Sequence, residues 1–222
     1  MPFVVEFFRD GGIFMYFILG VSVASLGIVL ERGWVVLFRH NINAAALMEE
    51  VQKLVMANHV DRAVKLCNAE GDVGLARVLR AGLLRSNRTV SEMQSAMDEA
   101  ALEVVSEIQR RTPYLGMWAN VATLFGLLGT VQGLILAFHA VEAAAPEEKQ
   151  SMLAAGIAIA MYTTAAGLVV AIPTMVLHSF LSNRSTRLVD EIDTCAVKLL
   201  NLLAARQRGT LKEDAEATAI AP

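Results

Sequence analysis

Two long stretches without any charged residue constrain this chain more than any other feature. Residues 113–141 and 150–183 contain no Asp, Glu, Lys or Arg. Each stretch is longer than the roughly 20 residues that a helix needs to cross a bilayer. A third stretch, residues 11–30, is also free of charge. None of them shows the alternation of a lipid-facing barrel strand, so we expect three membrane-spanning helices.

The distribution of basic residues predicts how these helices are oriented. All but two of the 19 Lys and Arg residues lie between the first two stretches or after the third. The exceptions are Arg9 and Lys149. Because basic residues gather on the cytoplasmic side, we expect the N-terminus outside and the C-terminus inside. The net charge of −3 averages a basic inner side and an acidic outer loop, and it excludes little.

The predicted fold is an all-α membrane protein whose three transmembrane helices are extended by cytoplasmic helices into one tall bundle. A helix over 152–181 would measure about 45 Å, so it would tilt in the roughly 30 Å hydrocarbon layer or project beyond it. Ser91 and Gln94 have the spacing of a capping box that opens a helix. The expected segments are an outer N-terminal arm at 1–10, transmembrane helices at 11–31, 113–139 and 152–181, a cytoplasmic helical region at 32–112, an outer loop at 140–151, a cytoplasmic helix at 182–206 and a disordered tail at 207–222.

The sequence offers no chemistry of the kind that enzymes use. It has no Gly-rich phosphate loop, no zinc-binding His-Glu-x-x-His and no nucleophile elbow. Cys67 and Cys195 fall in the predicted cytoplasmic parts, and neither has a second Cys or a His at metal-ligand spacing. We therefore expect buried thiols, no enzymatic activity and no cofactor.

Small and hydroxyl-bearing residues recur along the second and third uncharged stretches. Small residues allow helices to approach closely in lipid. The hydroxyls have two interpretations: a polar line that faces a partner or a pore, which we favour, or simple packing with each hydroxyl bonded to a carbonyl four residues earlier. The hydroxyl residues are Thr123, Thr130, Thr163 and Thr164, and the packing glycines are Gly126, Gly129, Gly133, Gly156 and Gly167.

The uncharged stretches contain no carboxylate at mid-membrane depth. An intramembrane carboxylate is the usual proton site, so this chain alone should not form a complete proton relay. His139 and His178 lie near opposite ends of the second and third stretches. Either could pass protons at an entrance or exit, or be an interfacial polar group without that role.

Two motifs in these stretches resemble those of a known family. Residues 126–133, Gly-Leu-Leu-Gly-Thr-Val-Gln-Gly, and residues 164–173, Thr-Ala-Ala-Gly-Leu-Val-Val-Ala-Ile-Pro, are similar to the second and third spans of the MotA/TolQ/ExbB proton channel family. Residues 63–82 resemble the cytoplasmic region of TolQ and ExbB. Three spans match that branch better than the four-span MotA. Thr123 stands where those proteins usually have Pro, and Ile159 where they usually have Glu, which suggests a divergent member.

The resemblance implies a function in a membrane motor. It implies a homopentamer in the bacterial inner membrane, with a periplasmic N-terminus, around a dimer of a single-span partner of the TolR/ExbD type. The partner's membrane Asp would carry the proton, and Thr130 and Thr164 would face it, with Thr123 and Thr163 along the same pathway. Pro173 would kink the third span.

The work done by such a motor is not specified by these motifs. TonB-dependent transport, the Tol-Pal system and gliding motility are all compatible, each with its own further partner of the TonB/TolA or gliding-machinery kind. The alternatives are a non-conducting structural membrane scaffold and, less favoured, a channel that conducts by itself.

Overall fold

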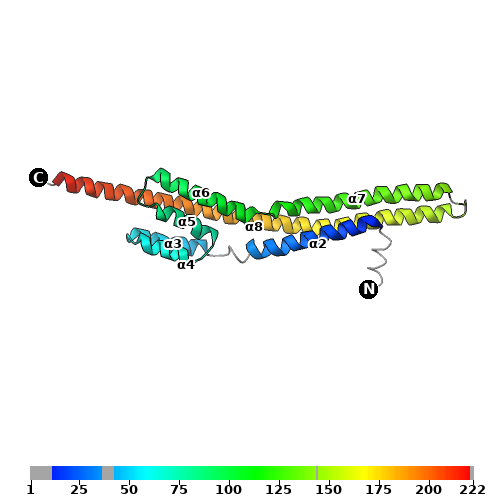
Figure 1. The fold of residues 1–222 in the computed structure, drawn as a ribbon, viewed down its shortest axis with the longest axis horizontal. Coiled ribbons are helices and arrows are strands. Elements are labelled where there is room, and N and C mark those ends of the chain that lie inside the picture. The colour runs from blue at the N-terminus through cyan, green and yellow to red at the C-terminus, as the bar shows by residue number, and fades with distance from the viewer. Residues whose placement is uncertain (1–11, 37–42, 144, 221–222) are drawn as a thin grey trace. The chain divides into compact units, whose positions relative to one another are not determined.

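The computed structural model describes residues 12–36, 43–143 and 145–220, so the predicted arm at 1–10 lies outside the described residues. Within these ranges the chain is helical and has no strand. It forms two compact units, Met1–Gly33 with Arg111–Ser182, and Trp34–Arg110 with Asn183–Pro222. The helices in chain order are α2 (Ile13–Trp34), α3 (Ala44–Met56), α4 (Val60–Ala69), α5 (Gly74–Leu84), α6 (Val90–Gln109), α7 (Thr112–Ala143) and α8 (Lys149–Ile220) (Figure 1).

Three of these helices are long and apolar enough to cross a membrane: α2, α7 and the apolar part of α8. With 22 residues, α2 is about 33 Å long, close to the thickness of the hydrocarbon layer. Because α7 has 32 residues and α8 has 72, both are longer than that layer. The predicted all-α membrane fold with three spanning helices is therefore confirmed.

The C-terminal end of α8 differs from the sequence prediction. The sequence predicts a disordered tail at 207–222, whereas the structure is helical as far as Ile220. This segment contains four Ala and two Glu, which are strong helix formers, and it has no Pro before the last residue. Intrinsic propensity therefore extends the helix even though the segment has no continuous apolar face.

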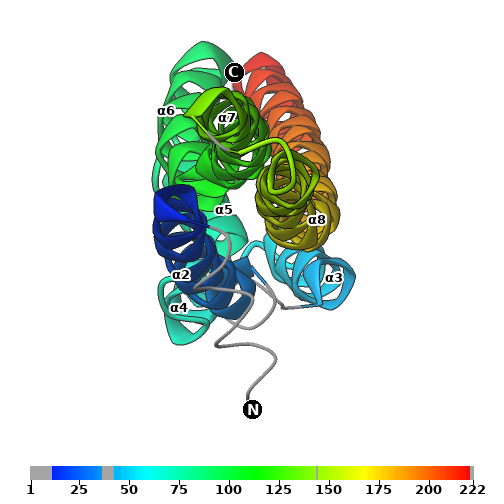
Figure 2. The same cartoon turned by 90° about the vertical axis from the view of Figure 1, so that its right-hand side faces the viewer.

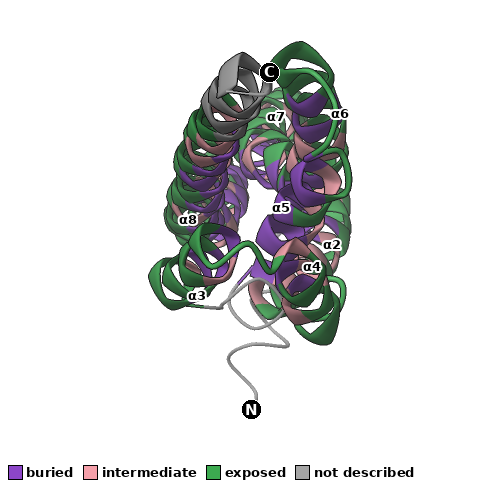
Figure 3. Ribbon diagram, turned by 90° about the vertical axis from the view of Figure 1, so that its left-hand side faces the viewer, coloured by how far each residue is buried: buried purple, intermediate pink, exposed green. Residues whose placement is uncertain are grey.

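In the unit of Trp34–Arg110 with Asn183–Pro222, short helices pack through one apolar face each, as the spacing of their hydrophobic residues predicts. The most completely buried of them is α5, with Val78, Leu79 and Leu83 inaccessible to solvent (Figure 3). On its surface, Arg77 binds Glu103 and Glu107 of α6, each at 3.1 Å. Ion pairs of this exposure contribute little to stability individually, so apolar burial dominates in this unit.

The N-terminus of α6 lies two residues before the predicted position. Thr89, not Ser91, is the N-cap, and its hydroxyl accepts a hydrogen bond from the backbone N–H of Glu92 at 3.3 Å. Thr89 and Glu92 have the same three-residue spacing as Ser91 and Gln94. Two overlapping capping signals therefore exist in the sequence, and the earlier one is used.

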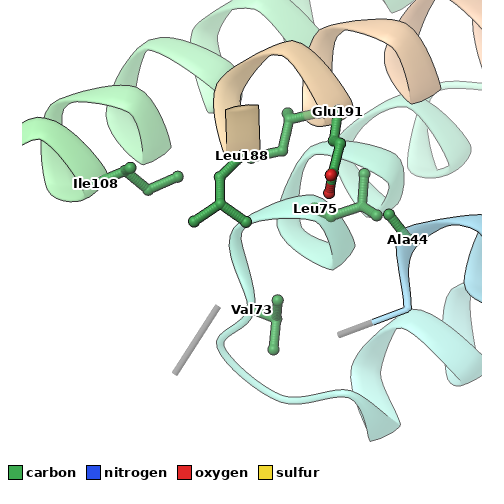
Figure 4. Close-up of a pocket in the computed structure, with 7 residues that line it drawn as sticks. Ala44, Val73, Leu75, Ile108, Leu188 and Glu191 are labelled. Carbon is green, nitrogen blue, oxygen red and sulfur yellow. The ribbon is translucent and has the colours of Figure 1, made fainter. Parts of the chain in front are cut away.

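A cavity in the same unit is too small to be a ligand site. It has a volume of about 10 Å³, close to the minimum that one water molecule requires (Figure 4). Its walls are mostly apolar, with the Glu191 side chain at one edge (Figure 4). The lining residues are Ala44, Val73, Leu75, Ile108, Leu188, Glu191 and Ile192. The cavity is a packing gap where α8 meets the short helices.

In the unit of Met1–Gly33 with Arg111–Ser182, the start of α7 is tied to the end of α2. Arg111 precedes α7 with a left-handed φ of 63°, which is uncommon outside glycine. Its Nη1 atom donates to both carboxylate oxygens of Glu31, at 2.6 and 2.5 Å. Pro113 follows in the first turn of α7, where its missing N–H leaves no helical bond unmade. The basic pair at 110–111 thus marks the end of a helix as well as an end of the apolar stretch.

The two longest apolar segments, α7 and the first part of α8, run antiparallel and pack through glycines (Figure 1). A Cβ atom added at Gly129 would lie 2.6 Å from Cβ and Oγ1 of Thr163. One added at Gly167 would lie 2.7 Å from the Ala122 carbonyl oxygen. Gly126, Gly133 and Gly156 make similarly close contacts with the facing helix. We call this line of contact the seam; all five of the predicted packing glycines lie in it.

The buried cysteine of α4 gives a test of the second unit's packing. Cys67 is 1% exposed, and burial raises the pKa of its thiol to about 11. Because only the thiolate reacts, we expect maleimide to label Cys67 very slowly at neutral pH in a Cys195→Ser background, and faster as the pH rises towards 11. An exposed thiol placed at Ser91 in the same background should be labelled rapidly. Equal rates for the two thiols in the folded protein would contradict the burial of Cys67.

The seam predicts an unusual sign for a glycine-to-alanine change. Alanine normally stabilises a helix by about 1 kcal/mol relative to glycine. In Gly129→Ala the new methyl group would overlap Thr163, and we expect a loss of about 1–3 kcal/mol, measured as a lower melting temperature of the purified protein in detergent. The matched control is Gly27→Ala in α2, where an added Cβ meets no atom within 4 Å. If the Gly129 variant melts at or above the Gly27 variant, the seam is not closely packed.

Candidate ion pathway

The seam divides the surface of the α7–α8 pair into two sides. On α7 the seam residues include Ala119, Ala122, Gly126 and Gly129, all buried. The residue before a seam residue and the residue after it are each rotated by about 100° from it around the helix, in opposite directions. Because α7 and α8 are antiparallel, the residues that follow the seam positions on both helices lie on the same side of the pair, and those that precede them lie on the other.

One of these sides is covered by α2 (Figure 2). Met15 and Ile18 of α2 pack against Ala166, and Val21 packs against Ala122 and Ala171. The partly buried residues that complete this contact precede seam positions; they are Trp118, Val121, Phe125 and Val170. We call the opposite side, formed by the residues that follow seam positions, the open side.

Three of the four predicted pathway threonines lie on the open side. Thr123 follows Ala122, Thr130 follows Gly129, and Thr164 follows Thr163. Thr130 and Thr164 are at the same level along the pair, because Gly129 and Thr163 face each other across the seam. Thr123 is exposed, and the other two are half-buried. The structure therefore brings these three hydroxyls to one face.

Thr163 has a different position. It lies in the seam itself, is 1% exposed, and fills the space above Gly129. Its hydroxyl donates to the carbonyl oxygen of Ala160 at 2.9 Å. In this chain Thr163 packs α7 against α8, so a position on the open side belongs to its neighbour Thr164.

The hydroxyl groups on the open side are bonded to the backbone. Oγ1 of Thr123 donates to the carbonyl oxygen of Ala119 at 3.2 Å, and Oγ1 of Thr130 to that of Leu127 at 2.6 Å. Oγ1 of Thr164 donates to the carbonyl oxygens of both Gly126 and Ala160, each at 3.4 Å. A hydroxyl has one hydrogen and two lone pairs. With the hydrogen committed to the backbone, each oxygen is left to accept a hydrogen bond from another group. These hydroxyls therefore bond to the backbone and still present their oxygens on an exposed polar face.

A further polar residue on the open side is absent from the sequence prediction. Asn120 follows the seam residue Ala119, is exposed, and makes no side-chain hydrogen bond within the described residues. It lies three residues before Thr123, in the same uncharged stretch. An uncharged amide within an apolar segment is the sequence signal for such a residue.

The remaining sequence candidates lie elsewhere. Ile159, at the position of the usual family Glu, precedes the seam residue Ala160 and is therefore not on the open side. Pro173 lies inside α8, and the next residue, Thr174, bonds back to the Val170 carbonyl at 2.7 Å. His139 is exposed, 4.0 Å from the Glu142 carboxylate. Within the described ranges no group of His, Cys, Asp or Glu could hold a metal ion.

Comparison with known proteins agrees with this architecture. The sequence model of the MotA/TolQ/ExbB proton channel family matches residues 70–194. An ExbB homologue of Methanothermobacter thermautotrophicus is 27% identical over 195 residues, which cover 86% of this chain and 67% of the relative. A Tol-Pal system protein TolQ of Haemophilus influenzae is 39% identical over 89 residues, covering 40% and 39% of the two chains.

A solved structure shows the same fold. The structure of C. jejuni MotAB matches with a TM-score of 0.62 at 18% identity, covering 85% of this chain and 75% of that one. The family match extends over more than half of the chain, including all of α7 and the motif-bearing part of α8. The chain is therefore a member of the MotA/TolQ/ExbB proton channel family.

Proposed function

We propose that the chain is the ion-conducting, stator-type subunit of a motor in the bacterial inner membrane that is driven by the proton-motive force. The observation that carries this proposal is the open side: an uncharged face that presents Thr123, Thr130 and Thr164 within a membrane-spanning pair of helices. Such a face can guide an ion but cannot bind and release a proton by itself. A partner must bring the ionisable group.

A single-span partner with a membrane carboxylate, of the TolR/ExbD type, meets this requirement. At the level of Thr130 and Thr164, the hydroxyl hydrogens are held by the backbone, so the oxygens can accept hydrogen bonds from another group. A protonated carboxyl can donate to such an oxygen, whereas a carboxylate has no hydrogen to donate. Protonation would therefore attach the partner to this face and ionisation would release it. This difference in contact is how proton transfer is coupled to movement.

Several copies of the chain would surround the partner. The open side exposes an amide and hydroxyls, which are unfavourable against lipid, while α2 covers the other side with apolar residues. A closed ring with the open sides inward removes the polar face from lipid. We take the homopentamer around a dimer from the family, with the basic end of α7 in the cytoplasm and the N-terminus in the periplasm. Nutrient transport, the Tol-Pal system and gliding are the candidate processes.

A non-conducting scaffold is the second candidate. The close glycine seam favours it, because such packing would serve assembly even without ion flow. The two candidates differ in whether the open-side hydroxyls matter for anything beyond folding.

We predict a proton flux that requires both the single-span partner and the hydroxyl groups on the open side. In liposomes that contain the chain and its single-span partner, Thr130→Val and Thr164→Val should each lower the flux about 2- to 10-fold, because a hydrogen bond contributes about 0.5–1.5 kcal/mol. Valine keeps the shape of threonine, so assembly with the partner should persist. The flux is measured with a pH-sensitive dye trapped in the liposomes.

The matched control is Thr174→Val, which removes a buried hydroxyl of α8 that bonds to the Val170 carbonyl away from the open side. This variant should conduct like the unmodified chain. Undiminished flux in both open-side variants would refute their assignment. An absence of flux with every candidate partner would favour the scaffold, and flux from the chain alone would make it an autonomous channel.

A further inference from the structure

We propose that His178 is the proton acceptor at the basic end of the open side, where it receives protons from the pathway and passes them to the cytoplasmic water. This inference rests on the proposed function and adds a residue that the threonine motifs do not include. It has two supports: the position of the imidazole against a glycine, and a neighbouring amide without a partner within the described residues.

The imidazole occupies space that Gly116 leaves vacant. A Cβ atom added at Gly116 would lie 3.3 Å from Cε1 of His178 and 3.5 Å from both ring nitrogens. The ring therefore lies against the backbone of α7, at a place where any larger residue would displace it. Gly116 follows the seam residue Leu115, so the ring is at the open side. His178 is half-buried, and neither nitrogen has a partner within the described residues.

Polar groups lead along the open side towards this ring. From the level of Thr130 and Thr164, Thr123 lies about 10.5 Å closer to the basic end, and Asn120 about 4.5 Å further. Gly116, with the ring of His178 against it, follows one turn later, about 6 Å beyond Asn120. The amide of Asn120 has no partner within the described chain, so in the membrane it requires water or a polar group of another chain. It would hold water between the hydroxyls and the imidazole.

The charged residues nearest to this end in the sequence are arginines. Arg111 immediately precedes α7 and is bonded to Glu31 of α2. The next ionisable residue along α8 is Arg184. No carboxylate of α7 lies within two turns of Gly116 to form an ion pair with the imidazole.

The transfer is a simple relay. The partner's carboxylic acid, at the level of Thr130 and Thr164, loses its proton to a chain of water molecules along the open side that ends near Asn120, and becomes a carboxylate. The neutral imidazole of His178 takes a proton from that water at one ring nitrogen and becomes an imidazolium. The imidazolium then loses a proton to the water at the basic end, and the neutral ring is restored. Imidazole can perform both steps because it has one donor and one acceptor nitrogen.

The experiment measures proton flux in liposomes that contain the whole chain with its single-span partner. His178→Gln keeps a polar side chain without a titrating ring. We expect the proton flux to fall at least about tenfold. A positioned acid or base provides about 10²-fold or more, but the loss should be smaller than that because water replaces part of the relay. His178→Ala should show a similar loss, and 4-methylimidazole added at the basic side should restore part of the flux. A purely structural role for His178 would show no such rescue.

Two further variants provide the controls. Gly116→Ala retains the imidazole but moves it, so its flux should lie between those of the unmodified chain and His178→Gln; Gly20→Ala, whose added Cβ meets no atom within 4 Å, should have no effect. His59→Gln changes an exposed histidine before α4 and should conduct normally. If Thr130→Val lowers the flux while His178→Gln conducts fully, the inference about His178 is wrong and the proposed function stands. If the unmodified chain never conducts with a partner, the proposed function itself fails.

Discussion

The close contact between α7 and α8 determines which way the polar groups of these two spanning helices face. Glycines at 126, 129, 133, 156 and 167 let the two backbones approach to a distance that no larger residue would allow. Packing of this kind replaces the hydrophobic effect as the source of helix association in lipid. Once the seam is fixed, helical geometry places α2 on one side and the threonines on the other. The candidate pathway is thus a consequence of where the glycines are.

Much of this arrangement could be predicted from sequence. A long stretch without charged residues identifies a spanning helix, because the bilayer core excludes charge and sets a minimum helix length. The two motifs locate Thr130 and Thr164, and the structure puts both on one face at one level. Glycine spacing likewise indicated close packing, since the same periodicity that aligns small residues along a helix also aligns them against a neighbour.

Other features depend on which helix faces which, and periodicity alone does not contain that information. Thr163 and Thr164 are adjacent, yet one is enclosed in the seam and the other lies on the open side. Asn120 can be assigned to the open side only when the orientation of α7 is known. The contact of Gly116 with His178 joins residues from two helices, so neither helix alone predicts it. The N-terminus of α6 also differs from the prediction, because two capping signals overlap and their spacing does not say which one is used.

The unpaired amide of Asn120 also has a consequence for the life of the protein in the cell. A newly inserted copy that has found no neighbours must present that amide, and the exposed Thr123 beside it, to lipid tails. Such a copy is less stable in the membrane than an assembled one, by the free energy of a polar group without a partner. The polar face therefore makes a solitary copy the less stable form in the membrane, and association through that face the more stable one.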